Sequence, residues 1–273
     1  MPTSKTLTTL NTKTKMMPKL LEYALGHRIH AFSTMRTDGA SQGAYAQFNI
    51  NPYCGDAPEH VAQNLHSLCR VLGIAPSNLV MPHQTHETTV RQVGSELLSM
   101  PQNVRQMVLE GVDALITNVP GVCIGVSTAD CIPILLYDAE HRATAAIHAG
   151  WRGTVKRIAQ NAIAQMRAAF DTNPQSLRAV IAPGISLQNF EVGDEVYEAF
   201  AKATFPMNDI AQRHNKWHIN LPLCNQLQLQ ELGVKAENIY ATDICTYNRC
   251  NDFFSARRLG INSGRIFTGV TIR

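Results

Sequence analysis

Two apolar segments, CIPILLYD at residues 131–138 and RATAAIH at residues 142–148, decide the fold of this chain. Both are rich in residues that favour β-strands, and the short stretch Ala139-Glu140 between them is typical of a turn. Apolar residues occupy both faces of each segment. Because a strand that is apolar on both faces is usually covered on both, the pattern predicts an antiparallel hairpin inside a buried sheet.

A tight turn at residues 139–140 would set the register of this hairpin and place Cys131 opposite His148. Directly opposed residues of an antiparallel pair have Cβ atoms about 4.5–5.5 Å apart and point to the same face. A thiol and an imidazole at that separation can share a metal ion or form a thiolate–imidazolium nucleophile. The alternative is a structural cysteine beside a hydrogen-bonded histidine, because free cysteine is among the most buried residue types.

Strands and amphipathic helices alternate along the rest of the chain. Apolar residues follow the helical period over residues 155–170, where we expect Thr154 to be the N-cap and residues 171–174 to end the helix. Asp56 is expected to cap a helix over residues 57–72, which Gly73 ends. Further helices are expected at 194–204 and 221–231, and strands at 27–34, 79–93 (one strand or a pair), 112–117, 122–127, 178–182, 239–244 and 266–271. This mixture predicts an α+β or α/β fold with a mixed sheet.

The composition is that of a globular protein, with 45% apolar and 16% charged residues among 273. A net charge of +3 without a clustered basic patch argues against nucleic acid as a partner, and no run approaches the ~20 apolar residues that cross a membrane. Seven cysteines behind a start without a secretory signal indicate reduced thiols and a cytoplasmic location. We expect a flexible leader over residues 1–18 and a single catalytic domain over residues 19–273.

Polar residues beside the hairpin favour a functional site over a structural cysteine. Asp130 directly precedes Cys131 and could orient a metal ligand or move a proton. After His148 the chain reads AGWRGT at residues 149–154 and enters the predicted helix. The backbone N–H groups of that helix start and the Arg152 guanidinium could together bind an anion such as phosphate.

A catalytic zinc commonly has three protein ligands and one open position, so a third ligand is needed. In the sequence PHQTH at residues 82–86, His83 and His86 have opposite parity on a regular strand, so one of them can face the site. His86, Cys131 and His148 would form a Cys-His-His site of this kind. The chain contains no CxxC pair, which argues against a closed four-ligand zinc finger.

Other candidate residues have a simpler interpretation. Cys245 and Cys250, near Asp243, could form a second metal site, but no histidine accompanies them and buried thiols are the preferred interpretation. Arg36 follows the first predicted strand, and the adjacent Arg257 and Arg258 follow an aromatic segment. Paired arginines of this kind often form salt bridges at the surface.

In chain order, the blocks FSTMRTDGAS, FNINPYCGD, HQTHETTV, STADCIPILLYD, HAGWRGT, FEVGDEV and FFSARRLG resemble the YfiH-like laccase-domain family, also called multicopper polyphenol oxidase domain proteins or purine nucleoside phosphorylases. They run from about Arg28 to Ile272, and the pair TADC and HAGWRGT is highly specific. The resemblance implies an α+β fold, a four-layer α/β/β/α sandwich with mixed sheets. It also implies one metal ion, usually zinc, on His86, Cys131 and His148.

The activities that the resemblance implies are phosphorolysis of adenosine, inosine, guanosine and methylthioadenosine, and deamination of adenosine. The partners would be a purine nucleoside and phosphate, and we expect a monomer. Zinc would activate the water that attacks C6 of adenine in deamination, and phosphate would attack C1′ in phosphorolysis. We expect Cys131, His148 and Asp130 to be catalytic, and the residues expected at substrate or phosphate are Arg36, Asn49, Arg152, Thr154 and Arg258.

Two blocks depart from the usual family pattern. Three alternative functions also stay open. Ala256 replaces an aromatic residue in FSARR, and Met35 displaces Arg36 by one position in FSTMRTDG. A four-copper oxidase is excluded, because the ten histidines contain no HxH pair. The alternatives are a metal-independent Cys131–His148 hydrolase or amidase, a single-site copper-binding polyphenol oxidase, and a metal-binding protein without enzymatic activity.

Overall fold

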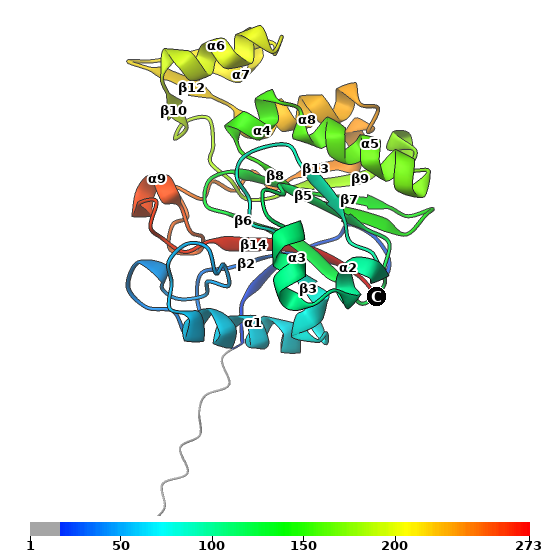
Figure 1. The fold of residues 1–273 in the computed structure, drawn as a ribbon. Helices are drawn as coiled ribbons and strands as arrows, with labels where there is room; N and C mark the ends of the chain where they lie inside the picture. Colours follow the sequence, from blue (N-terminus) through cyan, green and yellow to red (C-terminus); the bar gives the residue numbers. More distant parts are fainter. Residues whose placement is uncertain (1–16) are drawn as a thin grey trace, which may run out of the picture.

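Two β-sheets stacked face to face form the centre of the molecule, as the computed structural model of residues 17–273 shows (Figure 1). The leader expected at residues 1–18 lies outside the described residues except for its last two positions. The five-stranded sheet has the order β1-β2-β14-β6-β3, with β1 at Leu20–Tyr23, β2 at Ile29–Thr34, β14 at Ile266–Ile272, β6 at Cys123–Thr128 and β3 at Leu79–Val80. The six-stranded sheet has the order β13-β9-β7-β8-β5-β4, with β13 at Ile239–Ala241, β9 at Arg178–Ile181, β7 at Ile132–Asp138, β8 at Ala143–Ala149, β5 at Ala114–Thr117 and β4 at Val90–Gln92.

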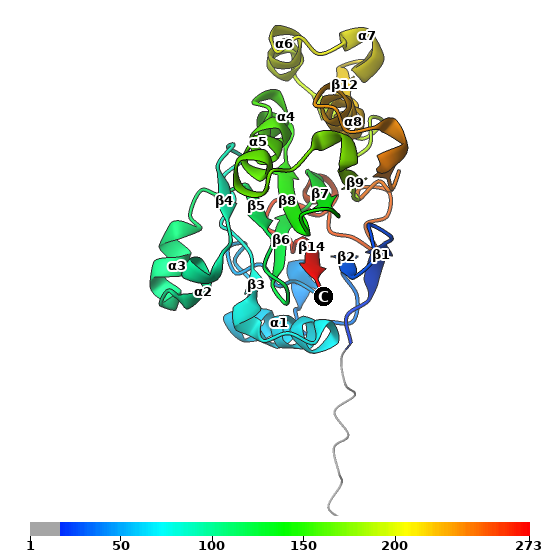
Figure 2. The ribbon, with the colours of Figure 1, turned by 90° about the vertical axis from the view of Figure 1, so that its right-hand side faces the viewer.

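Helices cover the outer face of each sheet, and together with the sheets they make four layers (Figures 1 and 2). Helix α1 (Pro58–Leu72) lies on the five-stranded sheet, while α5 (Ile158–Phe170) and α8 (Leu221–Glu231) lie on the six-stranded sheet. A separate apolar cluster fills each of the three interfaces between layers. The expected α/β/β/α sandwich with mixed sheets is therefore confirmed.

Shorter elements surround these layers. The helices are α2 (Ser95–Ser99), α3 (Gln102–Val108), α4 (Trp151–Val155), α6 (Asp194–Lys202), α7 (Met207–Ile210) and α9 (Ala256–Leu259). A three-stranded sheet of β10 (Glu191–Val192), β12 (Trp217–Ile219) and β11 (Ala211–Arg213) lies with α6 and α7 beyond α8 (Figure 1). No helix within residues 17–273 has both the length and the apolar character needed to cross a membrane.

The predicted hairpin is present as β7 and β8, but its register differs by two residues from the expected one. Pro133, and not Cys131, lies opposite His148. The loop contains residues 139–142, because the Asp138 carboxylate accepts the backbone N–H groups of Glu140 and His141 and so holds a wider turn. A shift of two residues keeps every side chain on its predicted face. Cys131 therefore still shares the inner face of the sheet with His148, as a diagonal neighbour.

The predicted helix over residues 155–170 is divided into α4 and α5. Arg157, with a φ of 64°, interrupts the helical path and is the N-cap of α5. Thr154 is not a cap: it lies buried inside α4, where its carbonyl accepts from Gln228 and its hydroxyl accepts from Asn225. Asp171 ends α5 in the left-handed conformation, as expected.

Two other local predictions also need correction. Residues 79–93, predicted as one strand or a pair, form two short strands, β3 and β4, which lie in different sheets. One long strand is wrong, because backbone N–H groups between β3 and β4 bind the side chain of Asp113 and not a neighbouring strand. Helix α1 has Ala57 as its N-cap residue, with Pro58 in its first turn. The Asp56 carboxylate accepts hydrogen bonds from the backbone N–H of Ala57, the hydroxyl of Ser41 and the side-chain amide of Asn49. No side chain caps the helix, so Asp56 is not its cap.

We expect Gly125→Ala, a change in the middle of the five-stranded sheet, to lower the free energy of unfolding by about 3 kcal/mol, as overpacking of a core does. A Cβ at this position would lie 2.2 Å from Cζ of Phe267 and 2.7 Å from the backbone oxygen of Thr268. The matched control is Gly94→Ala, which has no atom within 4 Å of the added Cβ and should change stability by less than about 0.5 kcal/mol. Urea denaturation measures both, and equal effects would contradict the packing argument.

Candidate metal centre

Three side chains from separate segments meet where β7 begins and β8 ends. The donor atoms of His86, Cys131 and His148 all lie within 4.8 Å of one another, and the Cys131 sulfur lies 3.8 Å from Nε2 of His86. His148 is 3% exposed, Cys131 is partly buried and His86 is exposed. His86 and Asp130 both have positive φ values, 65° and 88°, so the backbone is strained on either side of the cluster. Strain of this kind persists only where the surrounding structure holds it.

Asp113 is the residue that holds this arrangement. It is fully buried directly before β5, and its Oδ1 accepts a hydrogen bond of 2.7 Å from Nδ1 of His148. The same carboxylate accepts the backbone N–H groups of Thr85, His86 and Glu87. One side chain thus fixes the tautomer of His148, leaving Nε2 available, and also fixes the segment that carries His86.

The charges at the site are strongly coupled. Burial by itself would raise the pKa of the Cys131 thiol, but the charge and hydrogen bond of His148, with a contribution from His86, lower it to about 6. Burial would lower the pKa of His148, but the charge of Cys131 and the hydrogen bond to Asp113 raise it to about 9. The pKa of Asp113 is also lowered, because hydrogen bonding from His148 and from the backbone outweighs the effect of burial. The two opposite shifts favour a thiolate–imidazolium pair in the site without a metal ion.

Gly150 leaves space beside all three donor atoms. A Cβ on this residue would lie 3.1 Å from the Cys131 sulfur, 3.1 Å from Cδ2 of His86 and 3.7 Å from Nε2 of His148. Two imidazole nitrogens and a thiolate are donors that zinc accepts, and copper accepts the same set. The residues present therefore fit a single metal ion with one side left open.

Gly150→Ala should weaken metal binding about tenfold or more, since changes next to metal ligands typically cost 10–100-fold in affinity. The φ of −68° at this position suits alanine, so the free energy of unfolding should change little. Competition with a coloured zinc chelator measures the affinity. Gly153→Ala is the matched control, because its added Cβ would make only contacts of 3.4 Å or longer. Unchanged affinity in Gly150→Ala would mean that the ion does not bind beside this glycine.

The cluster opens into a pocket of about 160 Å³. Tyr53 and His83 form one wall as stacked rings, with centroids 4.2 Å apart, and Nδ1 of His83 bonds to the Glu110 carboxylate. Arg265 also lines this pocket. Sequence reasoning did not identify Asp113, Tyr53 or Arg265. The only signal for Asp113 was a carboxylate at the start of an apolar strand, which is costly unless it is paired.

The structure gives Asp130 a different partner from the expected one. Its carboxylate accepts the hydroxyl of Thr246 and the backbone N–H of Arg257, at 2.7 Å each. It therefore joins Thr246 and the first turn of α9 to the start of β7, and it does not bond to His148. The carboxylate that bonds to His148 is Asp113, and a role of Asp130 in moving a proton stays a prediction.

The residues expected to bind substrate or phosphate do not line the pocket. Arg36 donates to the backbone oxygens of Ala46 and Cys250, and the guanidinium groups of Arg152 and Arg258 lie over the rings of Trp151 and Tyr247. Thr154 is fully buried inside the short helix α4. Asn49 is also fully buried, but its Oδ1 accepts the backbone N–H of Arg265, so it supports a residue that does line the pocket.

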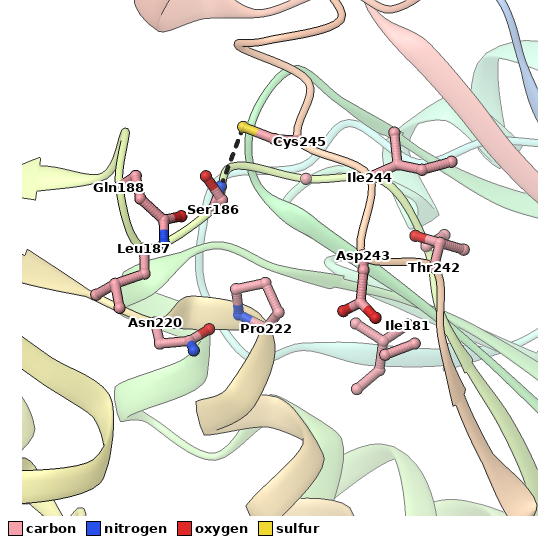
Figure 3. Close-up of a pocket in the computed structure, with 13 residues that line it drawn as sticks. Ile181, Ser186, Leu187, Gln188, Asn220, Pro222, Thr242, Asp243, Ile244 and Cys245 are labelled. Carbon is pink, nitrogen blue, oxygen red and sulfur yellow. Dashed lines mark hydrogen bonds between the residues drawn. The ribbon is translucent and has the colours of Figure 1, made fainter.

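A second pocket, of about 240 Å³, lies around Cys245 (Figure 3). The Cys245 sulfur accepts the backbone N–H of Ser186, marked in Figure 3, and the side-chain amide of Asn189. Within residues 17–273, His86, Cys131 and His148 form the only cluster that could hold a metal ion. Cys245 and Cys250 are free thiols outside that cluster; Cys245 is buried, as the preferred interpretation expects, but Cys250 is only partly buried.

Comparison with known proteins identifies the family of this chain and agrees with its fold. Residues 30–273 match the family model described as multi-copper polyphenol oxidoreductase laccase. A purine nucleoside phosphorylase of Bacteroides thetaiotaomicron is 46% identical over 264 residues, which are 96% of this chain and 98% of the relative. Adenosine deaminase RL5, from an unknown prokaryotic organism, is 43% identical over 245 residues, 89% of this chain and 93% of the relative. The crystal structure of Bacillus licheniformis hypothetical protein YfiH has the same fold, with a TM-score of 0.87 at 24% identity and coverage of 94% and 97%.

Fold and site together define a class of protein. Its members are four-layer α+β proteins with one His-Cys-His cluster at the end of the central hairpin of the six-stranded sheet. Within that class, the chain belongs to the laccase-like YfiH family, to which the family model and both curated relatives connect it over most of its length. The relatives are named as enzymes that act on purine nucleosides.

Proposed function

We propose that this protein is a zinc-dependent purine nucleoside phosphorylase, acting on adenosine, inosine, guanosine and methylthioadenosine, with adenosine deaminase activity. The observation that carries the proposal is the His86–Cys131–His148 cluster, which Asp113 holds, which Gly150 leaves uncrowded and which lines a pocket. The names of the two curated relatives support the substrate class. All seven cysteines are free, which is consistent with a cytoplasmic enzyme, and we propose that it acts as a monomer.

In this proposal His86, Cys131 and His148 hold the zinc ion. When bound, the ion supplies a Lewis acid that polarises the reacting group or its attacking water. Asp113 keeps a proton on Nδ1 of His148, so that Nε2 remains the ligand atom. The stacked rings of Tyr53 and His83 give the purine base an aromatic surface, on which nucleobases bind by stacking.

The test is to incubate the purified, zinc-analysed protein with adenosine and phosphate and to separate the products. We expect adenine and ribose 1-phosphate from phosphorolysis and inosine from deamination. A nucleoside panel then compares adenosine, inosine, guanosine and methylthioadenosine. A zinc-filled protein that converts none of them would overturn the proposal and would favour a metal-binding protein without this activity.

A second candidate, a metal-independent hydrolase or amidase, is favoured by one specific feature. Asp113, His148 and Cys131 form a connected chain of carboxylate, imidazole and thiol, the arrangement that activates a cysteine nucleophile.

Copper on the same three ligands, with oxidation of phenols, is the variant that the family description suggests. Elemental analysis separates these possibilities. Stoichiometric zinc supports the nucleoside phosphorylase, stoichiometric copper supports the phenol oxidase, and an active protein without metal supports the hydrolase.

A further inference from the structure

We propose that Arg265 binds the phosphate ion that attacks the nucleoside. This inference rests on the proposed phosphorylase function and deepens it. It replaces the arginines that the sequence suggested with a residue that lies beside the metal cluster. The ligand would be inorganic phosphate, a tetrahedral oxyanion, and the same chemistry is present in the 5′-phosphate of a nucleotide.

Charge in the pocket favours an anion. Arg265 is the only lysine or arginine among the described residues that line the pocket, and no aspartate or glutamate lines it with them. Within residues 17–273 no carboxylate lies at salt-bridge distance from its guanidinium, in contrast to Arg157 and Arg249, which pair with Glu231 and Asp252. An unpaired guanidinium in a partly buried pocket is attracted to an oxyanion and can bind it through two parallel hydrogen bonds.

The guanidinium is held in place and still has donors to offer. Its Nη1 donates to the backbone oxygens of Ser263 and Gly264, and Nη2 donates to that of Ile261. The backbone N–H of Arg265 donates to the buried Asn49, and β14 begins at the next residue. Nε–H and the second N–H of Nη2 take no part in these bonds. These two N–H groups are therefore still available to donate to an oxyanion.

The positions also fit the reaction. Arg265 lines the same pocket as Cys131 and His148, and so does the aromatic wall of Tyr53 and His83. In phosphorolysis a phosphate oxygen forms a bond to C1′ of the ribose while the C1′–N9 bond breaks. The electron pair of that bond goes to N9 of the purine, which takes up a proton from the phosphate or from solvent. The products are the free base and ribose 1-phosphate, so no oxidant or reductant is needed.

Two reactions of one enzyme provide the test, because phosphorolysis consumes phosphate and deamination does not. We expect Arg265→Gln to raise the KM for phosphate about 10- to 100-fold, the loss that follows from removing hydrogen bonds to a charged group. The rate of inosine formation without phosphate should stay within about threefold, and the zinc content should not change. Arg265→Lys keeps the positive charge but loses the guanidinium, so its KM for phosphate should lie between those of Arg265→Gln and the wild type. Arg213→Gln is the matched control, because Arg213 lies over Trp217 in the outer three-stranded sheet and should have a wild-type KM.

The possible outcomes are distinguishable. If the wild-type protein makes neither adenine nor inosine, the proposed function fails. If it makes adenine and Arg265→Gln has an unchanged KM for phosphate, only the present proposal fails. A parallel assay with adenosine 5′-monophosphate identifies the source of the anion: a defect confined to the nucleotide would overturn the proposal that free phosphate binds here. Loss of zinc or of both activities together in Arg265→Gln and Arg265→Lys would show a structural role and would also overturn it.

Discussion

Cys131→Ala should abolish stoichiometric zinc binding and lower the rates of phosphorolysis and deamination by more than about 100-fold. Changing a residue that only supports a metal ligand typically costs 10–100-fold in affinity, and the loss of a ligand should cost more. Cys131 supplies the only sulfur of the cluster, and its thiolate is the one anionic donor. Elemental analysis of the purified variant and product analysis with adenosine and phosphate measure the two effects.

His86→Ala and Cys250→Ala make this experiment decisive. His86 would be a ligand in a metal site, whereas in a cysteine nucleophile His148 is the base and Asp113 its carboxylate partner, and His86 only adds to the lowering of the Cys131 pKa. We therefore expect His86→Ala to lose metal and activity as Cys131→Ala does. Cys250→Ala removes a partly buried thiol outside the pocket and should behave as the wild type. An active His86→Ala protein beside an inactive Cys131→Ala protein would refute the metal site and support the hydrolase.

Asp113→Asn should lower the free energy of unfolding by about 3–5 kcal/mol, the usual effect of breaking a buried charged pair. Both carboxylate oxygens of Asp113 accept hydrogen bonds, from His148 and from three backbone N–H groups. An asparagine side chain has only one oxygen. Its NH2 group would replace the other oxygen and would face hydrogen-bond donors that it cannot accept from. The same change should weaken zinc binding 10- to 100-fold, because both His148 and the segment of His86 lose their support. Urea denaturation and zinc titration measure the two effects.

Asp138→Asn is the control for this prediction. Asp138 is also fully buried and also bonds to a histidine and to backbone N–H groups, but it lies at the opposite end of β7. We expect it to lower stability without changing the zinc affinity of the folded protein. Equal zinc affinities in the folded Asp113→Asn and wild-type proteins would show that Asp113 does not support the metal ligands.

Asp113 lies at the centre of the site, whichever chemistry the protein performs. It fixes one ring nitrogen of His148 and also the backbone of residues 85–87. A metal site needs the His148 Nε2 lone pair, and a cysteine nucleophile needs the same nitrogen as a base. The metal content, and not the geometry of Asp113, therefore decides between the two functions.

Local sequence patterns predicted the faces of the central strands correctly. Ile134 and Ile147 pack toward the helices α5 and α8, and Leu135 and Ala146 pack toward the other sheet. The period of two along a strand does not depend on the partner strand, so alternation alone assigns each side chain to a face. That parity is why Cys131 and His148 could be placed on one face although the register was wrong by two residues.

The register and the ends of several elements depended on contacts that local patterns do not contain. The Asp138 carboxylate widens the hairpin loop, and buried Gln228 and Asn225 of α8 bind Thr154, where the predicted helix was to begin. Each of these side chains could equally have pointed to solvent in an isolated segment. Their preference for backbone partners follows from burial in the folded protein, where an unpaired polar group is costly.

The sequence by itself therefore predicted the mixture of strands and helices, the shared face of Cys131 and His148 on a buried hairpin, and the three side chains that could bind a metal ion. The four layers were expected from the family resemblance of its motifs. Only the tertiary structure decided that Asp113 supports the cluster, that Gly150 leaves it uncrowded, and that Arg265 lines the pocket while Arg36, Arg152 and Arg258 do not. The physical reason is that these residues come from strands and loops far apart in the chain. Their neighbours are set by sheet stacking and by the satisfaction of buried polar groups, and neither is encoded within a single segment.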